Sequence, residues 1–242
     1  MLPLADLPVI GGAAFVAALL GGVTGYGTGL LMPPILVPLI GAEAVVPVIG
    51  LSALFTNASR VVAYRPDLDL DRLRRIAPVA LPATLLGAYG FTLLSGRGAA
   101  ILIGSMLILM VPLRMLARRR GLVLSGRGLT AAAVGYGVVN GGTSGSGVLL
   151  LTLLMAAGLT GPQVIATDAA ISFLLGLGKS GMFAMRGALD LRLAGLALVI
   201  GVAAVPATFL ARRLAHRLPG TWHLRILDGA VVLGGLLLIR GA

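Results

Sequence analysis

Residues Gly21–Pro38 read GGVTGYGTGLLMPPILVP and lie inside a long apolar run. The stretch holds five glycines between Gly21 and Gly29, followed by the pair Pro33-Pro34. A continuous membrane helix does not need this composition, whereas a broken helix that lines a cavity does. A second stretch of the same kind, Tyr136–Leu154, reads YGVVNGGTSGSGVLLLTLL. We therefore expect one interrupted helical segment in each half of the chain.

The composition places the chain in a membrane. Of its 242 residues 58% are hydrophobic and only 11% are charged, with a mean hydropathy of +1.04. A soluble protein has about 25% charged residues. The surplus of apolar residues in this chain has no protein interior large enough to hold it, so part of the surface must face lipid. The chain has no cysteine, which excludes disulfides and thiolate chemistry.

The net charge of +11 comes from arginine, because Lys179 is the only lysine. The arginines cluster between apolar runs, which is typical of cytoplasmic loops that face anionic lipid, and does not favour nucleic acid as a partner. The first ten residues contain no lysine or arginine. They therefore lack the basic region of a signal peptide, and we treat them as mature sequence.

Eight apolar runs divide into two groups by length. Six suit single crossings of about 20 residues: Ala44–Tyr64, Ile76–Leu94, Ala99–Leu116, Val164–Met185, Leu193–Ala211 and Leu224–Ile239. As straight helices, Pro8–Ile40 and Leu129–Ala157 would measure about 50 and 43 Å, against a hydrocarbon core of about 30 Å. These two runs contain the glycine-rich stretches, so each is predicted to be two shorter helices joined by a break.

The chain also repeats itself. Asn57–Arg65 matches Gly178–Arg186 at an offset of 121 residues, and Leu68–Leu70 matches Leu189–Leu191 at the same offset. This indicates a tandem duplication, with a first repeat at 1–120 and a second at 121–242. Each repeat would hold one broken, re-entrant segment and three transmembrane helices, about eight membrane segments in one all-α transport domain.

The arginine distribution predicts that the two repeats have inverted topology. If each broken segment returns to the side from which it enters, 14 arginines fall on one face. The opposite face then keeps Arg97, Arg186, Arg192 and Arg240. The excess of positive charge marks the cytoplasmic face, which puts both termini outside the cytoplasm.

The two breaks are the candidate binding site. Two interrupted segments in matching positions are typical of transporter substrate sites, and the amide groups at the start of a half-helix favour an anion. The alternative is that small residues only let helices pack closely. The candidate residues are Thr24, Gly25, Tyr26, Gly27, Thr28, Gly29, Asn140, Gly142, Thr143, Ser144, Gly145, Ser146 and Gly147.

Three further residues are candidates for coupling or gating. Asp168 would lie about two turns inside a helix that starts with Thr160 as its N-cap. It is either a proton carrier or gate, or a carboxylate held locally near that helix start. Lys179 either draws an anion inward or reaches the outer interface, and the second is favoured. Asn57 would line the path or bond a neighbouring helix.

No catalytic or nucleotide-binding motif is present, so we expect neither an enzyme nor a cofactor. The spacing of Asp67, Asp69 and Asp71 fits no metal-ligand pattern. His216 and His223 share one basic loop, where they read as membrane-surface residues rather than a metal site.

The sequence resembles the TauE/SafE family of sulfite exporters. The resemblance rests on GYGTGLLMPPILVPLIG (Gly25–Gly41), on NGGTSGSGVLLLTLLMAAGL (Asn140–Leu159) and on the stretch from Ala166 to Asp190. RPDLDLDRL (Arg65–Leu73) and PATFLARRLAHRL (Pro206–Leu218) add to it. The family's common GxGGG opening reads GYGTG here, so Tyr26 and Thr28 would narrow or repolarise the pocket.

The resemblance implies transport of sulfite or another small sulfur-containing or organic anion across a prokaryotic inner membrane. We predict a secondary transporter that works by alternating access, with Asp168 as the candidate for proton coupling. The alternatives are an anion-selective channel and a non-transporting accessory subunit. Low charge density between the arginine clusters is compatible with a homodimer.

Overall fold

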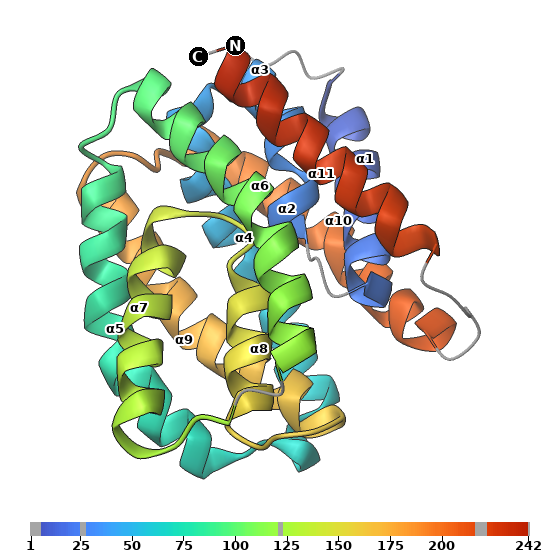
Figure 1. Cartoon of the computed structure of the whole chain (residues 1–242). Coiled ribbons are helices and arrows are strands. Elements are labelled where there is room, and N and C mark those ends of the chain that lie inside the picture. The colour runs from blue at the N-terminus through green and yellow to red at the C-terminus, as the bar shows by residue number, and fades with distance from the viewer. Residues whose placement is uncertain (1–5, 25–27, 121–122, 216–221, 242) are drawn as a thin grey trace.

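The computed structural model describes residues 6–24, 28–120, 123–215 and 222–241, and their regular structure is entirely helical (Figure 1). The predicted all-helical class is thus confirmed. The helices are α1 (Asp6–Thr24), α2 (Thr28–Leu31), α3 (Pro33–Ile40), α4 (Ala42–Ala63), η1 (Arg65–Asp67, a 3-10 turn), α5 (Leu70–Phe91), α6 (Gly96–Arg120), α7 (Gly126–Gly142), α8 (Gly147–Ala156), α9 (Pro162–Met185), α10 (Leu191–Ala215) and α11 (Trp222–Arg240).

Four helical segments are long and apolar enough to cross a membrane: Ala42–Ala63, Gly96–Leu113, Pro162–Met185 and Leu191–Ala211. They correspond to four of the six predicted crossings. The predicted crossing Ile76–Leu94 falls mostly in α5, whose first turns carry the charged sequence LDRLRR, and Leu224–Ile239 falls in α11.

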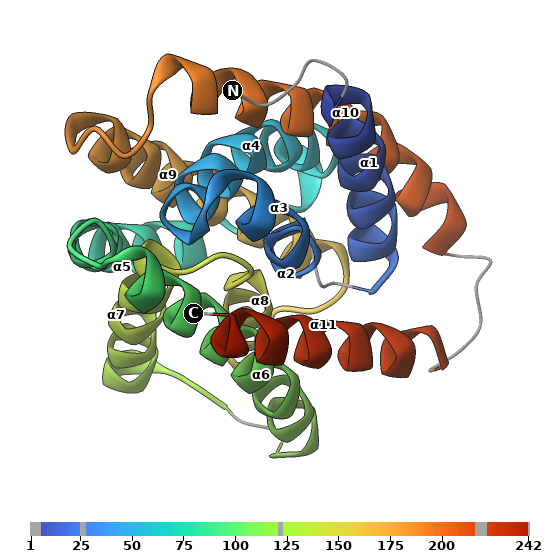
Figure 2. The ribbon, with the colours of Figure 1, turned by 90° about the horizontal axis from the view of Figure 1, so that it is seen from above.

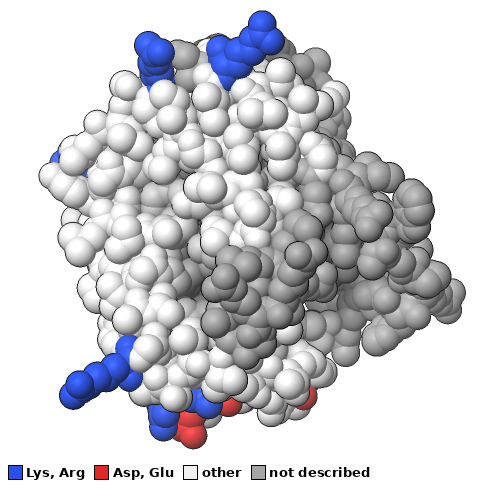
Figure 3. All heavy atoms as spheres, in the orientation of Figure 1, with Lys and Arg blue, Asp and Glu red and all other residues white. Residues whose placement is uncertain are grey.

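The outer surface of the helices suits lipid. Val62, Leu86, Leu109 and Leu236 are each more than half exposed, on four different helices. Figure 3 shows charged side chains toward the top and bottom of the visible face, with an uncharged band between them in its described part. Exposed apolar surface of this extent indicates a membrane protein rather than a soluble one.

Both glycine-rich segments are broken, as predicted. The second consists of α7 and α8, joined by Thr143–Ser146. The Leu124 N–H, just before α7, donates a hydrogen bond to the Ala156 carbonyl oxygen at the end of α8 (2.7 Å). The two ends of this segment therefore lie side by side, so the chain returns to the end of the molecule from which it enters.

The first segment differs from its prediction because it holds three helices rather than two. After α1, α2 is a single turn, and α3 begins anew at the Pro33-Pro34 pair. Proline has no N–H to donate and fixes φ near its helical value, so it suits the first turn of a helix and interrupts a preceding one. The prolines thus create a second interruption of the helical segment, which its glycine content alone did not predict.

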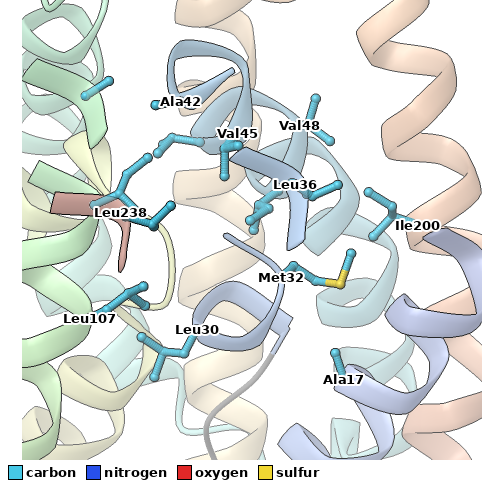
Figure 4. Packing of buried hydrophobic residues seen from close by; sticks show 14 of the residues in the cluster. Ala17, Leu30, Met32, Leu36, Ala42, Val45, Val48, Leu107, Ile200 and Leu238 are labelled. Atoms are coloured by element: carbon cyan, nitrogen blue, oxygen red, sulfur yellow. The ribbon is translucent and has the colours of Figure 1, made fainter. Parts of the chain in front are cut away.

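The short helices α2 and α3 lie in the middle of the fold, with α1, α4 and α11 around them in the view from above (Figure 2). Leu30, Met32 and Leu36 are fully buried there. They face the apolar core, to which Leu107 of α6 and Leu238 of α11 also belong (Figure 4). This packing holds the first break inside the molecule, since each buried leucine contributes about 1.5–3 kcal/mol.

The second break is held by close contact between α5 and α7. A Cβ atom on Gly141 would run into the Thr84 carbonyl oxygen, and one on Gly137 would lie 2.8 Å from the Ala83 Cβ. Glycine at these positions lets the two backbones approach closely. The position of α7, and so of the break that follows it, depends on this contact.

The helices pack in four main pairs. α5 packs along α7, α1 along α10, α4 along α9, and α6 along α11. α4 also contacts α10, and α9 also contacts α5. The pair α4 and α9 carries the three residues predicted for coupling or gating, Asn57, Asp168 and Lys179.

The start of α9 corrects a smaller prediction. Its N-cap is Gly161, with φ of 53°, and not Thr160. A positive φ is a backbone conformation that glycine adopts without strain, which explains why the cap falls on Gly161. Nearby, the Asp69 carboxylate accepts a hydrogen bond from the Arg72 N–H, and the Asp69 N–H donates to the Thr167 hydroxyl (3.1 Å). The first bond caps α5, and the second ties the starts of α5 and α9 together.

Candidate functional site

The second break is a short polar loop inside the protein. Between α7 and α8, Thr143, Ser144 and Ser146 are buried, and Gly145 has φ of 81°. The Thr143 hydroxyl donates to the Val139 carbonyl oxygen (2.6 Å), and the Ser146 hydroxyl donates to the Asn140 side-chain oxygen (2.7 Å). The Ser144 hydroxyl has no hydrogen-bond partner in the described structure.

Lys179 of α9 caps the end of α7. Its Nζ donates to the carbonyl oxygens of Asn140 and Thr143, each at 2.6 Å, and the residue is 5% exposed. The prediction that Lys179 reaches the outer interface is therefore wrong. The last carbonyl groups of a helix lack partners and carry partial negative charge, so a cation there is stabilising.

The start of α8 has no comparable cap. Ser146 is the N-cap residue, but its side chain makes no capping hydrogen bond because it is engaged with Asn140. The first amide groups of a helix lack intrahelical acceptors. The Leu149 N–H donates to the Ser146 carbonyl oxygen (2.9 Å), and Lys179 satisfies the carbonyl end of the break, so the Ser144 hydroxyl remains as an unpartnered donor beside the positive end of α8.

The short helix α2 of the first broken segment meets the second break. A Cβ atom on Gly29 would lie 2.7 Å from the Gly145 Cα, and one on Gly145 would lie 2.5 Å from the Leu30 Cδ2. The backbones at Gly29 and Gly145 are thus in direct contact, in the middle of the helices. Thr28 is half-buried beside this contact. The Thr24 side chain and residues Gly25, Tyr26 and Gly27 lie outside the described part of the chain.

Asp168 is paired across the helix interface. Its Oδ2 lies 2.9 Å from Arg60 Nη2 of α4, and Asn57 Oδ1 accepts from Arg60 Nη1 at 3.5 Å. The Asp168 side chain is 3% exposed and that of Arg60 is 25% exposed. Arg60 belongs to the last turn of α4. Asp168 is held by another helix rather than by its own helix start.

A buried tyrosine links this ion pair to the second break. The Tyr136 hydroxyl lies close to the side chains of Ser146 and Ser172 and within electrostatic reach of Asp168. It makes no hydrogen bond of ordinary geometry in the described structure, and neither does Asp168 Oδ1. Tyr136, Ser172 and Arg60 were not among the predicted site residues.

The fold brings the predicted residues into two connected groups. Around the breaks lie Thr28, Gly29, Asn140, Gly142, Thr143, Ser144, Gly145, Ser146, Gly147 and Lys179, and around the ion pair lie Asn57 and Asp168. A surface depression of about 620 Å³ lies elsewhere, between the end of α9 and the start of α10, with Asp190 and Arg192 in its lining.

The family model for the sulfite exporter TauE/SafE matches residues 10–238. The match spans both breaks and all the helices that hold them. The chain belongs to the TauE/SafE family. No curated protein and no solved structure matches it.

Membership of the TauE/SafE family makes this chain a multi-pass membrane permease of a transporter family. The resemblance inferred from the sequence is thereby confirmed. One sequence signal pointed to the missed residue Arg60: it is a charged residue inside the apolar run Ala44–Tyr64. Charges inside membrane segments require partners, and Asp168 is that partner.

Proposed function

We propose that the protein is a secondary transporter that moves a small anion, sulfite or another sulfur-containing or organic anion, by alternating access. The observation that carries the proposal is the contact of the two breaks at Gly29 and Gly145. Irregular backbone inside a membrane protein is tolerated where it lines a cavity or meets a ligand. Two such segments in contact match the known placement of transporter sites between repeats.

The chemistry of the second break favours an anion. Lys179 occupies the carbonyl end of α7, which would otherwise repel an anion. The unpartnered Ser144 hydroxyl is then a buried hydrogen-bond donor without an acceptor, beside the start of α8, which carries partial positive charge. An oxyanion supplies several acceptors and would be held by neutral donors, which lets it be released as well as bound.

The pairing of helices supports two inverted repeats at 1–120 and 121–242. If α1 to α6 correspond to α7 to α11, with α2 and α3 together matching α8, the contacts among α1, α4, α5, α7, α9 and α10 have counterparts. α5 on α7 corresponds to α10 on α1, and α5 on α9 corresponds to α10 on α4. The pairs α4 with α9 and α6 with α11 join corresponding helices. Rocking of one repeat against the other would expose the breaks alternately.

The charge distribution supports placement in a prokaryotic inner membrane with both termini outside the cytoplasm. Arg97 starts α6 and Arg240 ends α11, and both of these helix ends lie at the top of Figure 1. The arginines of η1 and of the start of α5 lie at the bottom. The arginine-rich end would face the cytoplasm.

A thermal-stability screen of the purified protein tests the anion site. We expect sulfite, thiosulfate, sulfate, sulfoacetate or a simple carboxylate to raise the unfolding temperature, because a ligand that binds only the folded state stabilises it. Ser144→Ala should leave the protein without ligand as stable as before, since the hydroxyl has no partner to lose. It should weaken the stabilising anion by about tenfold, as a hydrogen bond to a charged group is worth about 1.5–3 kcal/mol.

The control is Thr152→Ala in α8. The Thr152 hydroxyl donates to the Val148 carbonyl oxygen within its own helix (2.8 Å), so its loss should not alter anion binding. Stabilisation by none of these anions, or an equal response from the Ser144→Ala variant, would count against an anion site at the breaks.

A further inference from the structure

One face of α9 carries polar residues from the arginine-rich end of the molecule to the second break. Asp168, Ser172 and Lys179 follow one another at four- and seven-residue spacings, which places them on one side of the helix. They span about 16 Å along the axis. Tyr136 of α7 and Ser146 of α8 lie against the middle of this row. We call these five residues the polar row.

Arg60 lies at the Asp168 end of the polar row, and it has more N–H donors than side-chain partners in the described structure. A guanidinium group has five N–H donors. In the described structure, its side-chain partners are Asp168 and, at a long 3.5 Å, Asn57. A quarter of its side chain is exposed, whereas Asp168 is buried. The arginine therefore faces both the interior and the arginine-rich end.

We propose that Arg60 is a second anion-binding residue, on the route to the breaks, where an entering anion replaces the Asp168 carboxylate on the guanidinium group. The proposal rests on the proposed anion transport and adds to it the residue that receives the anion first. Planar guanidinium groups suit oxyanions because they donate two parallel hydrogen bonds. Within the polar row only Lys179 carries a positive charge, and two of its three donors are engaged at the break.

The exchange has a consequence for the proton balance. A buried carboxylate that loses its counter-ion is costly and becomes neutral by taking up a proton. The proton comes from water at the arginine-rich end, where a quarter of the Arg60 side chain is exposed. Binding of one anion at Arg60 together with uptake of one proton by Asp168 then adds no net charge to the site.

The charged and titratable groups around Asp168 are compatible with this exchange. Arg60 of α4 and Tyr136 of α7 are the titratable or charged side chains that act on it. Asp69, at the start of α5, contacts the neighbouring Thr167 through its backbone N–H, and η1 contributes Arg65 and Asp67 nearby. α8 has no titratable residue.

Thiol labelling tests the proposal directly, because the chain has no native cysteine. Ser172→Cys places a thiol on the polar row, one turn beyond Asp168. The purified full chain in detergent is treated with sulfonatoethyl methanethiosulfonate, which is itself a small sulfonate anion, or with its trimethylammonium analogue. We expect the anionic reagent to label Cys at this position preferentially. Adding Asp168→Asn, which frees Arg60, should raise that preference by about tenfold, equivalent to about 1.4 kcal/mol.

A double variant that removes both charges keeps the test valid if the protein with Asp168→Asn alone fails to fold. In Arg60→Gln/Asp168→Asn both charges are removed, so no buried charge is left unpaired, and the preference for the anionic reagent should be lost. Arg60→Lys should retain it. Leu174→Cys is the matched control, since Leu174 lies two residues after Ser172, on the opposite side of α9, and is 43% exposed. A thiol facing lipid stays unreactive, as the thiolate is the nucleophile.

Two outcomes would overturn the proposal. One is labelling of Ser172→Cys no faster than Leu174→Cys in every background. The other is a preference between the two reagents that is the same with and without Arg60. Neither outcome depends on transport of sulfite, so the proposed function would stand or fall separately, by the anion screen.

Discussion

Lys179 is a buried cation whose hydrogen bonds go to main-chain carbonyl groups at a helix end. Replacing it by methionine, Lys179→Met, removes both donors and leaves the Asn140 and Thr143 carbonyl groups unsatisfied. We expect a loss of about 3 kcal/mol in the free energy of unfolding, because each buried unsatisfied group costs about 1–3 kcal/mol. Unfolding of the purified protein in detergent measures this loss.

The control for Lys179 lies half a turn away on the same helix. Gly181→Ala adds a Cβ atom that meets nothing within 4 Å, so this variant should be as stable as the original or slightly more so. If Lys179→Met matched the original stability, the ammonium group would have to lie at the membrane interface instead.

Gly145 and Gly147 make a second residue-scale pair. Gly145 has φ of 81°, and a Cβ atom there would lie 2.5 Å from Leu30. Gly145→Ala is therefore expected to lower stability by more than about 1 kcal/mol, from strain and from separation of the breaks. Gly147→Ala meets nothing within 4 Å and lies in a helix, so it should be tolerated. Equal unfolding temperatures for the two variants would mean that the breaks are not in contact.

At the scale of elements, the contact between α5 and α7 fixes where the second break lies. Gly141→Ala would drive a methyl group into the Thr84 carbonyl oxygen, whereas Gly135→Ala, on the same helix, meets nothing within 4 Å. We expect Gly141→Ala to lower the free energy of unfolding by about 1–3 kcal/mol and Gly135→Ala to leave it nearly unchanged. Paired thermal unfolding curves give the comparison, and a tolerated Gly141→Ala would argue against this helix packing.

The breaks were predictable because glycine content and segment length both depend on local sequence. The division of the first segment into three helices was not predicted. Whether Pro33 and Pro34 start a new helix depends on where the preceding turn ends. The roles of Lys179 and Arg60 depend on partners 36 to 108 residues away. A single sequence does not reveal which helix faces lie against each other, so these contacts were missed.

At the scale of the whole molecule, the position of the chain ends tests the topology. A reporter fused after Ala242 that is active only outside the cytoplasm, such as alkaline phosphatase, should be active, because the arginine-rich end is expected to face the cytoplasm. A reporter that requires the cytoplasm should be inactive at the same position. The reverse pattern would contradict the proposed orientation.

Counterflow in proteoliposomes tests most directly that the meeting breaks bind and move a small anion. Vesicles loaded with unlabelled sulfite are placed in a trace of radiolabelled sulfite, with thiosulfate and sulfoacetate in parallel. An alternating-access transporter should accumulate label transiently and saturate with concentration, and Ser144→Ala should raise the half-saturating concentration about tenfold, the effect of one hydrogen bond to an anion. Uptake that never saturates and shows no counterflow would indicate a channel, and no anion-dependent flux at all would contradict the account.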